Sequence, residues 1–285
     1  MAGSQSVEGR RDAPLSSLPL LSFGRVPRGA MRLNYSLSTW NYEAYTRPAS
    51  LEEAVADARR SGYGVEVWPS WKEERNLFGR ENRERLVRLL ADLPSSLHGG
   101  ADARTLDDHK VQIEAARDTG SPVLVLHRDH IGIAQGQSDY GLARDVAAYA
   151  RENGVTAALE NSDEDDALGV LLRALDAVPD LAACLDIGHV YAAYDHPVRD
   201  YLSRLSSRIK HLHLQDVHLV GGTRRAKNDS HRPPGQCDIP LADWQLLLST
   251  LEKIDFRGFA VIEVQPFTAV EIAAQAAEFL ESIGA

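Results

Sequence analysis

The chain contains few cysteines and no long apolar run. Only Cys184 and Cys237 occur among its 285 residues, and they form no CxxC pair. Such a sequence has no disulfide framework, so the reducing cytoplasm is the expected compartment. No apolar run approaches the roughly 20 residues that are needed to span a bilayer. We therefore expect a cytoplasmic protein that does not cross a membrane.

Positive charge is also scarce. The 31 Lys and Arg residues are outnumbered by 41 Asp and Glu residues, which gives a formal net charge of −10. An acidic chain repels phosphate backbones at long range, and basic residues gather only in short pairs such as Arg224-Arg225. Nucleic acid is thus a disfavoured partner, and a small molecule is the expected one. The oligomeric state stays open.

Residues 1–30 differ in composition from the rest of the chain. They mix Gly, Ser, Pro and Arg around one short Leu-rich patch. Arg10-Arg11 and the apolar stretch after it faintly resemble an export signal, but Ser and Pro interrupt that stretch. We predict a flexible leader over residues 1–30, or translation from an upstream start, and one folded domain over residues 31–285.

From Met31 onward, short β-type runs alternate with longer helical stretches. The helical stretches carry apolar residues at three-to-four spacing, as in "RERLVRLLADL". Ser50 and Glu53 form a capping-box pattern at the first helix start, and Gly62 is a stop signal for that helix. Strands are predicted over residues 31–36, 64–68, 95–100, 122–128, 155–161, 181–189, 209–216 and 259–264.

Eight βα units in roughly 255 residues match the size of a (β/α)8 TIM barrel, which is the predicted fold. The apolar fraction of 44% suffices for one large core of this kind, which branched side chains would fill. A doubly wound open sheet is the alternative. It normally has fewer strands, however, and no GxGxxG or P-loop motif follows the first strand here.

Ionisable side chains occur at the ends of the last six predicted strands, where the chemistry of a barrel takes place. A single histidine or acid at such a position is usually a hydrogen-bonded structural residue or a helix cap. Six consecutive strands that deliver such groups to one rim would crowd charges that repel one another unless a cation is present. The ionisable residues are His98, His127, Glu160, Asp186, His189, His211, His213, Asp216 and Glu263, and the neutral Asn161 directly follows Glu160.

A divalent metal would relieve that crowding, because carboxylates and imidazoles bind Mn²⁺, Mg²⁺, Co²⁺ or Zn²⁺. His211 and His213 share one strand face, and His213 is the better ligand because it lies nearer the carboxyl end. We expect His211 in the core or behind a ligand, and Asp216 as a loop anchor or as a helper that orients a ligand. The loop "KNDSHRPPG" contains Asp229 and His231, which are either solvated turn residues or further ligands.

Five segments carry a resemblance to a known family. "LEN" at the fifth strand, "LDIGH" at the sixth, "HLHLQD" at the seventh, the Pro/Gly loop, and "GFAVIEV" at the eighth resemble the xylose isomerase-like TIM-barrel superfamily. That superfamily includes sugar isomerases, ketose 3-epimerases, inosose dehydratases and endonuclease IV. The resemblance covers the chain after Met31 and favours the sugar phosphate isomerase/epimerase branch.

The resemblance implies two possible ligand sets. In the epimerase branch Glu160, Asp186, His213 and Glu263 would hold one metal, Glu160 and Glu263 would transfer protons, and His189 would contact substrate. The endonuclease IV branch implies up to three metals, and the sequence supplies a residue for each further ligand position. Those residues are His98, His127, His189, Asp229 and His231.

Aromatic and basic residues near the same rim complete the predicted site. Trp40 and Trp68 follow the first two strands and would either stack on a sugar or be partly buried under the loops. Arg224 or Arg225 would either contact a substrate phosphate or form a solvated charged loop.

The leading hypothesis is a divalent-metal-dependent isomerase or epimerase of carbohydrate metabolism. It would act on a sugar, sugar phosphate or cyclitol through an enediolate-like intermediate, and a dehydratase is a close relative of that chemistry. The alternative is a multi-zinc phosphoester hydrolase of the endonuclease IV type acting on a small substrate. A third hypothesis is a catalytically silent barrel. One bound ion favours the first hypothesis, and two or three favour the second.

Overall fold

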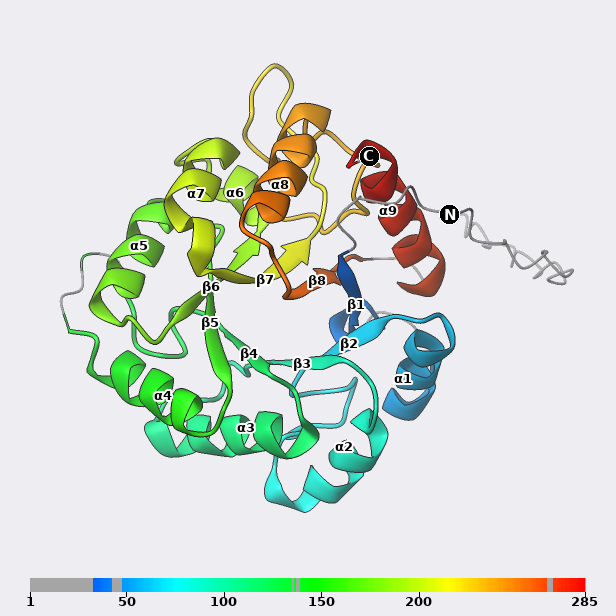
Figure 1. Cartoon of the computed structure of the whole chain (residues 1–285), viewed down its shortest axis with the longest axis vertical. Coiled ribbons are helices and arrows are strands. Elements are labelled where there is room, and N and C mark those ends of the chain that lie inside the picture. Colours follow the sequence, from blue (N-terminus) through cyan, green and yellow to red (C-terminus); the bar gives the residue numbers. More distant parts are fainter. Residues whose placement is uncertain (1–32, 43–47, 135, 137–138, 266–268, 285) are drawn as a thin grey trace, which may run out of the picture. The chain divides into compact units, whose positions relative to one another are not determined.

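The eight strands form one closed parallel barrel in sequential order, as the sequence predicted (Figure 1). The computed structural model describes residues 33–42, 48–134, 136, 139–265 and 269–284. The predicted leader over residues 1–30 lies outside them. The strands are β1 (Asn34–Ser38), β2 (Gly64–Val67), β3 (Ser95–His98), β4 (Val123–Leu126), β5 (Thr156–Glu160), β6 (Ala182–Asp186), β7 (Ile209–Leu214) and β8 (Phe259–Ile262).

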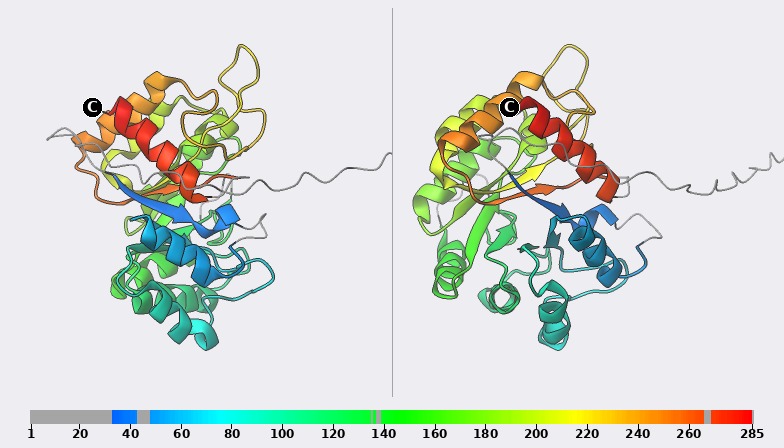
Figure 2. Two further views of the ribbon diagram at one scale, coloured as in Figure 1. Left: turned by 90° about the vertical axis from the view of Figure 1, so that its right-hand side faces the viewer. Right: turned by 45° about the vertical axis from the view of Figure 1, so that its right-hand side comes forward.

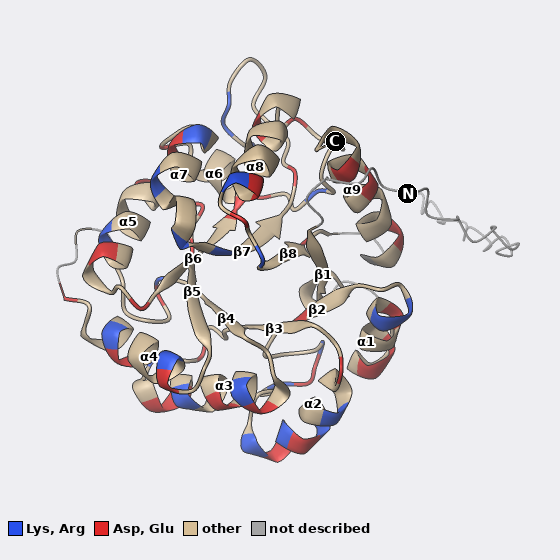
Figure 3. Ribbon diagram, in the orientation of Figure 1, with Lys and Arg blue, Asp and Glu red and all other residues tan. Residues whose placement is uncertain are grey.

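Helices surround the barrel and cover its outer face (Figures 1 and 2). Charged residues of both signs lie along several of these helices, whereas the strands are largely uncharged (Figure 3). None of the helices in the described part of the chain is long and apolar enough to cross a membrane. The helices are α1 (Leu51–Arg60), α2 (Arg83–Leu90), α3 (Leu106–Thr119), α4 (Gly141–Glu152), α5 (Ala167–Ala177), α6 (Ile187–Ala193), α7 (Val198–Leu205), α8 (Leu241–Lys253) and α9 (Ala269–Ile283).

The start of α1 follows the predicted cap with one difference. Ser50 Oγ accepts a hydrogen bond from the backbone N–H of Glu53 at 3.2 Å. The Glu53 carboxylate accepts from the backbone N–H of Ala49 rather than from that of Ser50. Both hydrogen bonds satisfy amide groups at the helix start, so the capping role remains although the reciprocal box is not formed.

The predicted sixth strand is too long at its carboxyl end. Asp186 ends β6, and its Oδ1 accepts a hydrogen bond from the backbone N–H of His189 at 2.9 Å. Asp186 therefore caps α6, and residues 187–189 are helical. This turn brings His189 Nε2 to 3.8 Å from Asp186 Oδ2 at the end of β6.

The interior of the barrel is more polar than expected. Val123 and Val125 of β4 pack there with three small residues, Ala158, Ala182 and Cys184. Beside them, β2 and β7 contribute a buried glutamate and two buried histidines, whereas branched apolar side chains were expected to fill this space. This polar half lies directly beneath the rim that carries the strand-end residues.

The barrel closes where β1 pairs with β8. Asn41, just beyond β1, donates its side-chain amide to the carbonyl of Ile262 at 2.9 Å and accepts from the backbone N–H of Val264 at 2.8 Å. The buried Asn41 amide thus continues the hydrogen bonding of the sheet past the end of β8. Glu263 lies between Ile262 and Val264, the two residues that Asn41 contacts.

Candidate functional site

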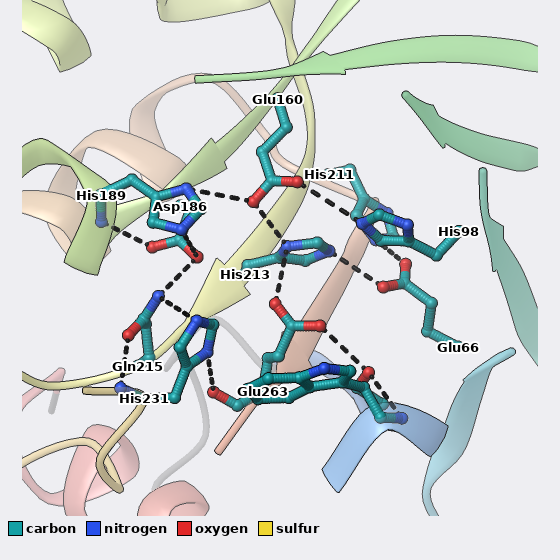
Figure 4. A network of polar contacts seen from close by, with 12 residues as sticks. Glu66, His98, Glu160, Asp186, His189, His211, His213, Gln215, His231 and Glu263 are labelled. Carbon is teal, nitrogen blue, oxygen red and sulfur yellow. Dashed lines mark hydrogen bonds and ion pairs between the residues drawn. The ribbon is translucent and has the colours of Figure 1, made fainter. Parts of the chain in front are cut away.

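Nine predicted residues meet at the carboxyl-terminal rim of the barrel, and we call them the rim cluster. Figure 4 labels all of them except His127 and Asp229. They come from β3, β5, β6 and β7, from α6, and from the segments that follow β4, β7 and β8. The residues are His98, His127, Glu160, Asp186, His189, His213, Asp229, His231 and Glu263.

His213 lies between two carboxylates at the centre of the rim cluster. Its Nδ1 is 3.0 Å from Glu160 Oε1 and 3.2 Å from Glu263 Oε2, and all three side chains are buried. Burial alone would lower the pKa of His213, but Cys184, Glu263, Glu160 and Glu66 around it raise that pKa well above its ordinary value. A protonated imidazole therefore balances the two carboxylates. Ser38 Oγ also donates to Glu263 Oε1 at 3.1 Å.

Asp186 and His189 are oriented by neighbouring amides. The His189 Nδ1–H donates to the carbonyl of Asn161 at 2.9 Å, so Nε2 is directed into the site. The Asn161 side chain bonds to the backbone N–H and carbonyl of Asp186. Gln215 donates to Asp186 Oδ2 at 2.9 Å. These fixed neighbours leave the ionisable groups little rotational freedom, which favours binding and catalysis.

A second group within the rim cluster consists of His98, His127 and Glu160, which each offer an atom within 4.8 Å of the others. Glu160 Oε2 is 3.0 Å from His127 Nε2 and 3.5 Å from His98 Nε2. Burial lowers the pKa of His127, but the Glu160 carboxylate outweighs that effect and raises it. Glu160 therefore contacts His213 at the centre of the rim cluster as well as the two histidines of this second group.

A third group consists of His189, Asp229 and His231. Asp229 Oδ2 is 2.7 Å from His231 Nε2 and 3.3 Å from His189 Nε2. His231 has a φ of 42°, in the left-handed region that is unusual for a residue with a side chain. Its backbone N–H donates to Gln215 Oε1 at 3.0 Å, which holds it in this conformation.

The loop that carries Asp229 and His231 connects β7 to α8 and projects beyond the helices (Figure 2). Asp216, buried at the start of this loop, accepts four backbone N–H groups of the same loop. Gly235 is one of the donors, and its φ of +78° together with the adjacent Phe279 ring leaves no room for a side chain. Asp216 thus anchors the loop, one of the two roles predicted from the sequence.

Two tryptophans border the rim cluster. The Trp68 ring stacks on His98 with centroids 4.0 Å apart and an interplanar angle of 14°. The Trp40 ring lies 4.5 Å from the His231 ring and 6.2 Å from Trp68. Both side chains are half-buried, so they cover one side of the cluster and keep some surface exposed to a ligand.

Arg224 was predicted to contact the substrate, but its partners in the structure lie outside the rim cluster. Its guanidinium pairs with Asp243 of α8, donates to the Tyr191 hydroxyl of α6 and lies 5.6 Å from the centre of the Tyr191 ring. These contacts hold the loop against α6 and α8 and occupy the guanidinium of Arg224 outside the rim cluster. Arg225 instead lines a groove of about 640 Å³ that includes Asp229.

The sequence reasoning missed Glu66 and Gln215. Glu66, in the middle of β2, contacts both His211 and His213 at the bottom of the site (Figure 4). Gln215 bonds to Asp186 and to the backbone of His231, so it connects two groups of the cluster. The "HLHLQD" motif contains Gln215, but a neutral amide gives no distinct signal beside so many ionisable residues.

The rim cluster has the donor set of a divalent cation site. Among the described residues, Asp229 Oδ1 is buried without a hydrogen-bond partner, and His98 Nε2 is buried with Glu160 Oε2 at 3.5 Å. Buried polar atoms are rarely left in that state unless a ligand or water satisfies them. Imidazole nitrogens and carboxylate oxygens suit Mn²⁺, Mg²⁺, Co²⁺ and Zn²⁺, and binding a cation would release the imidazole protons. The residues therefore fit a metal.

Residues 55–283 match the family model described as "Xylose isomerase-like TIM barrel". No curated protein sequence matches the chain significantly.

Several solved structures share the fold. A D-tagatose 3-epimerase-like protein has 18% identity and a TM-score of 0.67, covering 88% of this chain and 97% of its own. D-allulose 3-epimerase from Methylomonas sp. has 16% identity and a TM-score of 0.63, with coverages of 88% and 98%. A protein from Thermus thermophilus, soaked with ZnCl2, has 20% identity and a TM-score of 0.59, with coverages of 89% and 98%.

Proposed function

The chain belongs to the xylose isomerase-like TIM-barrel family, and we propose that it is a divalent-metal-dependent isomerase or epimerase of a small sugar. The observation that carries this proposal is the pair of buried carboxylates, Glu160 and Glu263, which approach the same nitrogen of His213. Two carboxylates at one substrate position can remove a proton and return it elsewhere. The similarity to structures named D-tagatose 3-epimerase-like protein and D-allulose 3-epimerase agrees with this chemistry.

Glu160, Asp186, His213 and Glu263 would hold the ion, which we propose to be Mn²⁺, Mg²⁺, Co²⁺ or Zn²⁺. The bound ion would supply Lewis-acid chemistry, which acidifies a C–H bond beside the carbonyl group of an open-chain sugar. One of the two glutamates would take that proton, and the other would deliver a proton to the opposite face or to the adjacent carbon.

Other residues of the site would position and shield the substrate. The His189 Nδ1–H donates to the Asn161 carbonyl. Burial would lower the pKa of His189, but Asp186, Asp229 and Glu160 raise it well above its ordinary value. The protonated ring can therefore donate Nε2–H to a substrate oxygen and stabilise an enediolate-like intermediate. The half-buried rings of Trp40 and Trp68 would stack on the apolar face of the sugar and exclude water from one side. Loss of a β-hydroxyl after the same proton abstraction would make the enzyme a dehydratase.

Solvent exchange tests the proposal directly. Metal-loaded protein is incubated in deuterated water with a panel of sugars, cyclitols and sugar phosphates, and substrate C–H exchange is followed by NMR and mass spectrometry. We expect exchange with at least one substrate, and its loss in Glu263→Gln. Glu164→Gln is the charge-matched control, because Glu164 is 64% exposed and pairs with Arg128. No exchange with any member of the panel would contradict the proposal.

We further propose that the substrate carries a phosphate or another anionic group. Arg225 and Lys227 line the groove next to Asp229, together with Tyr194 and Asn228. Among the described residues neither cation has an ion-pair partner, which leaves both available to an anion. The double variant Arg225→Gln/Lys227→Gln should raise KM for a phosphorylated sugar and leave KM for its unphosphorylated counterpart unchanged. An equal change for both sugars would contradict this role.

The second and third groups of the rim cluster support a second candidate function, a multi-zinc phosphoester hydrolase acting on a small substrate. His98, His127 and Glu160 form one group, and His189, Asp229 and His231 form the other. Several zinc ions can generate hydroxide and bind both the attacking and the leaving oxygen. Elemental analysis of protein purified without chelator separates the two functions. About one ion per chain favours the isomerase, whereas two or three with phosphoesterase turnover favour the hydrolase.

We propose the cytoplasm as the compartment, because Cys184 and Cys237 are both free. Fractionation of cells that express the tagged chain tests this location.

A further inference from the structure

The bottom of the site contains a carboxylate for which the proposed reaction has no role. Glu66 lies in β2, where each residue from Gly64 to Val67 is buried, and its own side chain is 0% exposed. Isolating a carboxylate from water is strongly unfavourable unless hydrogen-bond donors surround it. A barrel interior normally holds branched apolar side chains at such a position. The presence of this acid therefore needs a structural explanation.

Two hydrogen bonds and one close imidazole nitrogen surround the Glu66 carboxylate. His211 Nε2 is 2.7 Å from Oε2, and Ser96 Oγ donates to the same oxygen at 2.9 Å. His213 Nε2 is 3.0 Å from Oε1. His211 and His213 follow each other on the inner face of β7, so one acid contacts two successive inward-facing histidines.

The two nitrogens of His213 face opposite parts of the site. Nε2 faces Glu66, and Nδ1 faces Glu160 and Glu263 (Figure 4). A cation bound at Nδ1 would leave the ring proton on Nε2, the nitrogen that faces the Glu66 carboxylate. Carboxylates and carbonyls that bind the second nitrogen of a ligand histidine orient the ring and increase its basicity.

We propose that Glu66 is a positioning residue for the metal site, which holds His213 so that Nδ1 is presented to Glu160 and Glu263. His211 and Ser96 in turn hold the carboxylate of Glu66 in place through Oε2, whereas Oε1 faces His213. The inference rests on the proposed function only in assuming that a divalent ion binds at the rim cluster. It does not depend on the identity of the substrate.

A different role for Glu66 would have a different signature. Glu66, His98 and His213 each offer an atom within 4.8 Å of the others, so Glu66 could itself be a ligand of a deeper ion. Loss of a ligand removes that ion from the protein, whereas loss of a positioning residue weakens affinity and leaves the number of ions unchanged. Stoichiometry and affinity must therefore be measured together.

The experiment titrates the full chain, stripped of metal, with Co²⁺ alone and follows the visible absorption of the bound ion. We expect Glu66→Gln to weaken Co²⁺ binding by about 10- to 100-fold with unchanged stoichiometry. Glu66→Asp, which keeps the charge, should restore part of the affinity. Glu164→Gln is the charge-matched control and should bind as the unaltered protein does. Far-UV circular dichroism verifies that each variant is folded.

A measurement on the unaltered protein guards against a folding failure of Glu66→Gln. In Zn²⁺-loaded protein labelled with ¹⁵N-histidine, the His213 signals, identified by their loss in His213→Gln, should show a protonated Nε2. A protonated Nδ1, an unchanged affinity in Glu66→Gln, or the loss of a whole ion would each overturn the positioning role. If the unaltered protein binds no Co²⁺, this inference and the proposed function both fail. If it binds Co²⁺ but exchanges no sugar proton, only the proposed function fails.

Discussion

Replacing Asp216 by Asn is expected to loosen the β7–α8 loop while the barrel stays folded. Oδ1 of this buried carboxylate accepts from the backbone N–H groups of Val217 at 2.8 Å and Ile239 at 3.0 Å. Oδ2 accepts from those of Gly235 and Cys237, both at 3.0 Å. Asn has a single acceptor oxygen, so its NH2 group would face two backbone donors and two hydrogen bonds would be lost.

The size of the effect follows from those two hydrogen bonds. A hydrogen bond to a charged group contributes about 1.5–3 kcal/mol, so the loop should lose about 3–6 kcal/mol of local stability. Burial raises the pKa of Asp216 and the four backbone donors oppose that rise, so the measurement is made at about pH 8, where a carboxyl is ionised. Each 1.4 kcal/mol is a factor of ten in the opening equilibrium, and amide exchange in the loop should accelerate about 100-fold or more.

Hydrogen exchange followed by mass spectrometry measures this change over residues 217–239. Asp238→Asn is the matched control within the same loop. The Asp238 side chain is 52% exposed and accepts one hydrogen bond, from the backbone N–H of Leu219 at 2.9 Å. Its replacement should change stability by less than about 1 kcal/mol. If Asp216→Asn exchanges no faster than Asp238→Asn, the anchoring role of Asp216 is wrong.

Three further predictions concern the site and its surroundings. Glu263→Gln should lower kcat by about 100-fold or more, and intact turnover would rule out this residue as an acid or base. Removal of metal with a chelator should lower the thermal unfolding midpoint, and Mn²⁺, Co²⁺ or Zn²⁺ should restore it. An ion at 100 times its Kd stabilises the fold by about 2.7 kcal/mol, so an unchanged midpoint would argue against a bound ion. His109 is buried with Nε2 3.0 Å from the His130 carbonyl, and burial lowers its pKa. Its neutral form therefore stabilises the fold above pH of about 6.5, the unfolded value, and this contribution is lost as pH falls below that value. His109→Gln should reduce the pH dependence of the unfolding free energy below that pH, and identical slopes for the two proteins would contradict the assignment.

The strand-end residues were predictable because parallel strands of a barrel all end at one rim. Once eight βα repeats are recognised, residues that are distant in the sequence, such as His98 and Glu263, are expected at the same end of the barrel. The position of Asp186 followed from the same rule, although the helix that it caps starts earlier than predicted.

The residues beneath the rim were not predictable in the same way. In "GVEVW" the alternation of Glu66 with two valines is typical of a strand with one solvent-facing side, and only barrel closure turns that side inward. Closure brings Glu66 to His211, 145 residues away in the sequence. The partner of Arg224 was equally hidden, because no local pattern indicates that Asp243 of α8 lies beside the loop.

The joint between the first and the last strand has a consequence for biosynthesis. The two hydrogen bonds of Asn41 reach Ile262 and Val264, more than 220 residues further along the chain. A growing chain that still lacks β8 already carries most of the ionisable groups, but it has neither Glu263 nor the contacts that fix it. Contacts of such long sequence separation form late in folding. A truncated or partly translated barrel would therefore expose the acids and histidines without uniting them, and tight capture of a cation would mark a chain that is complete and closed.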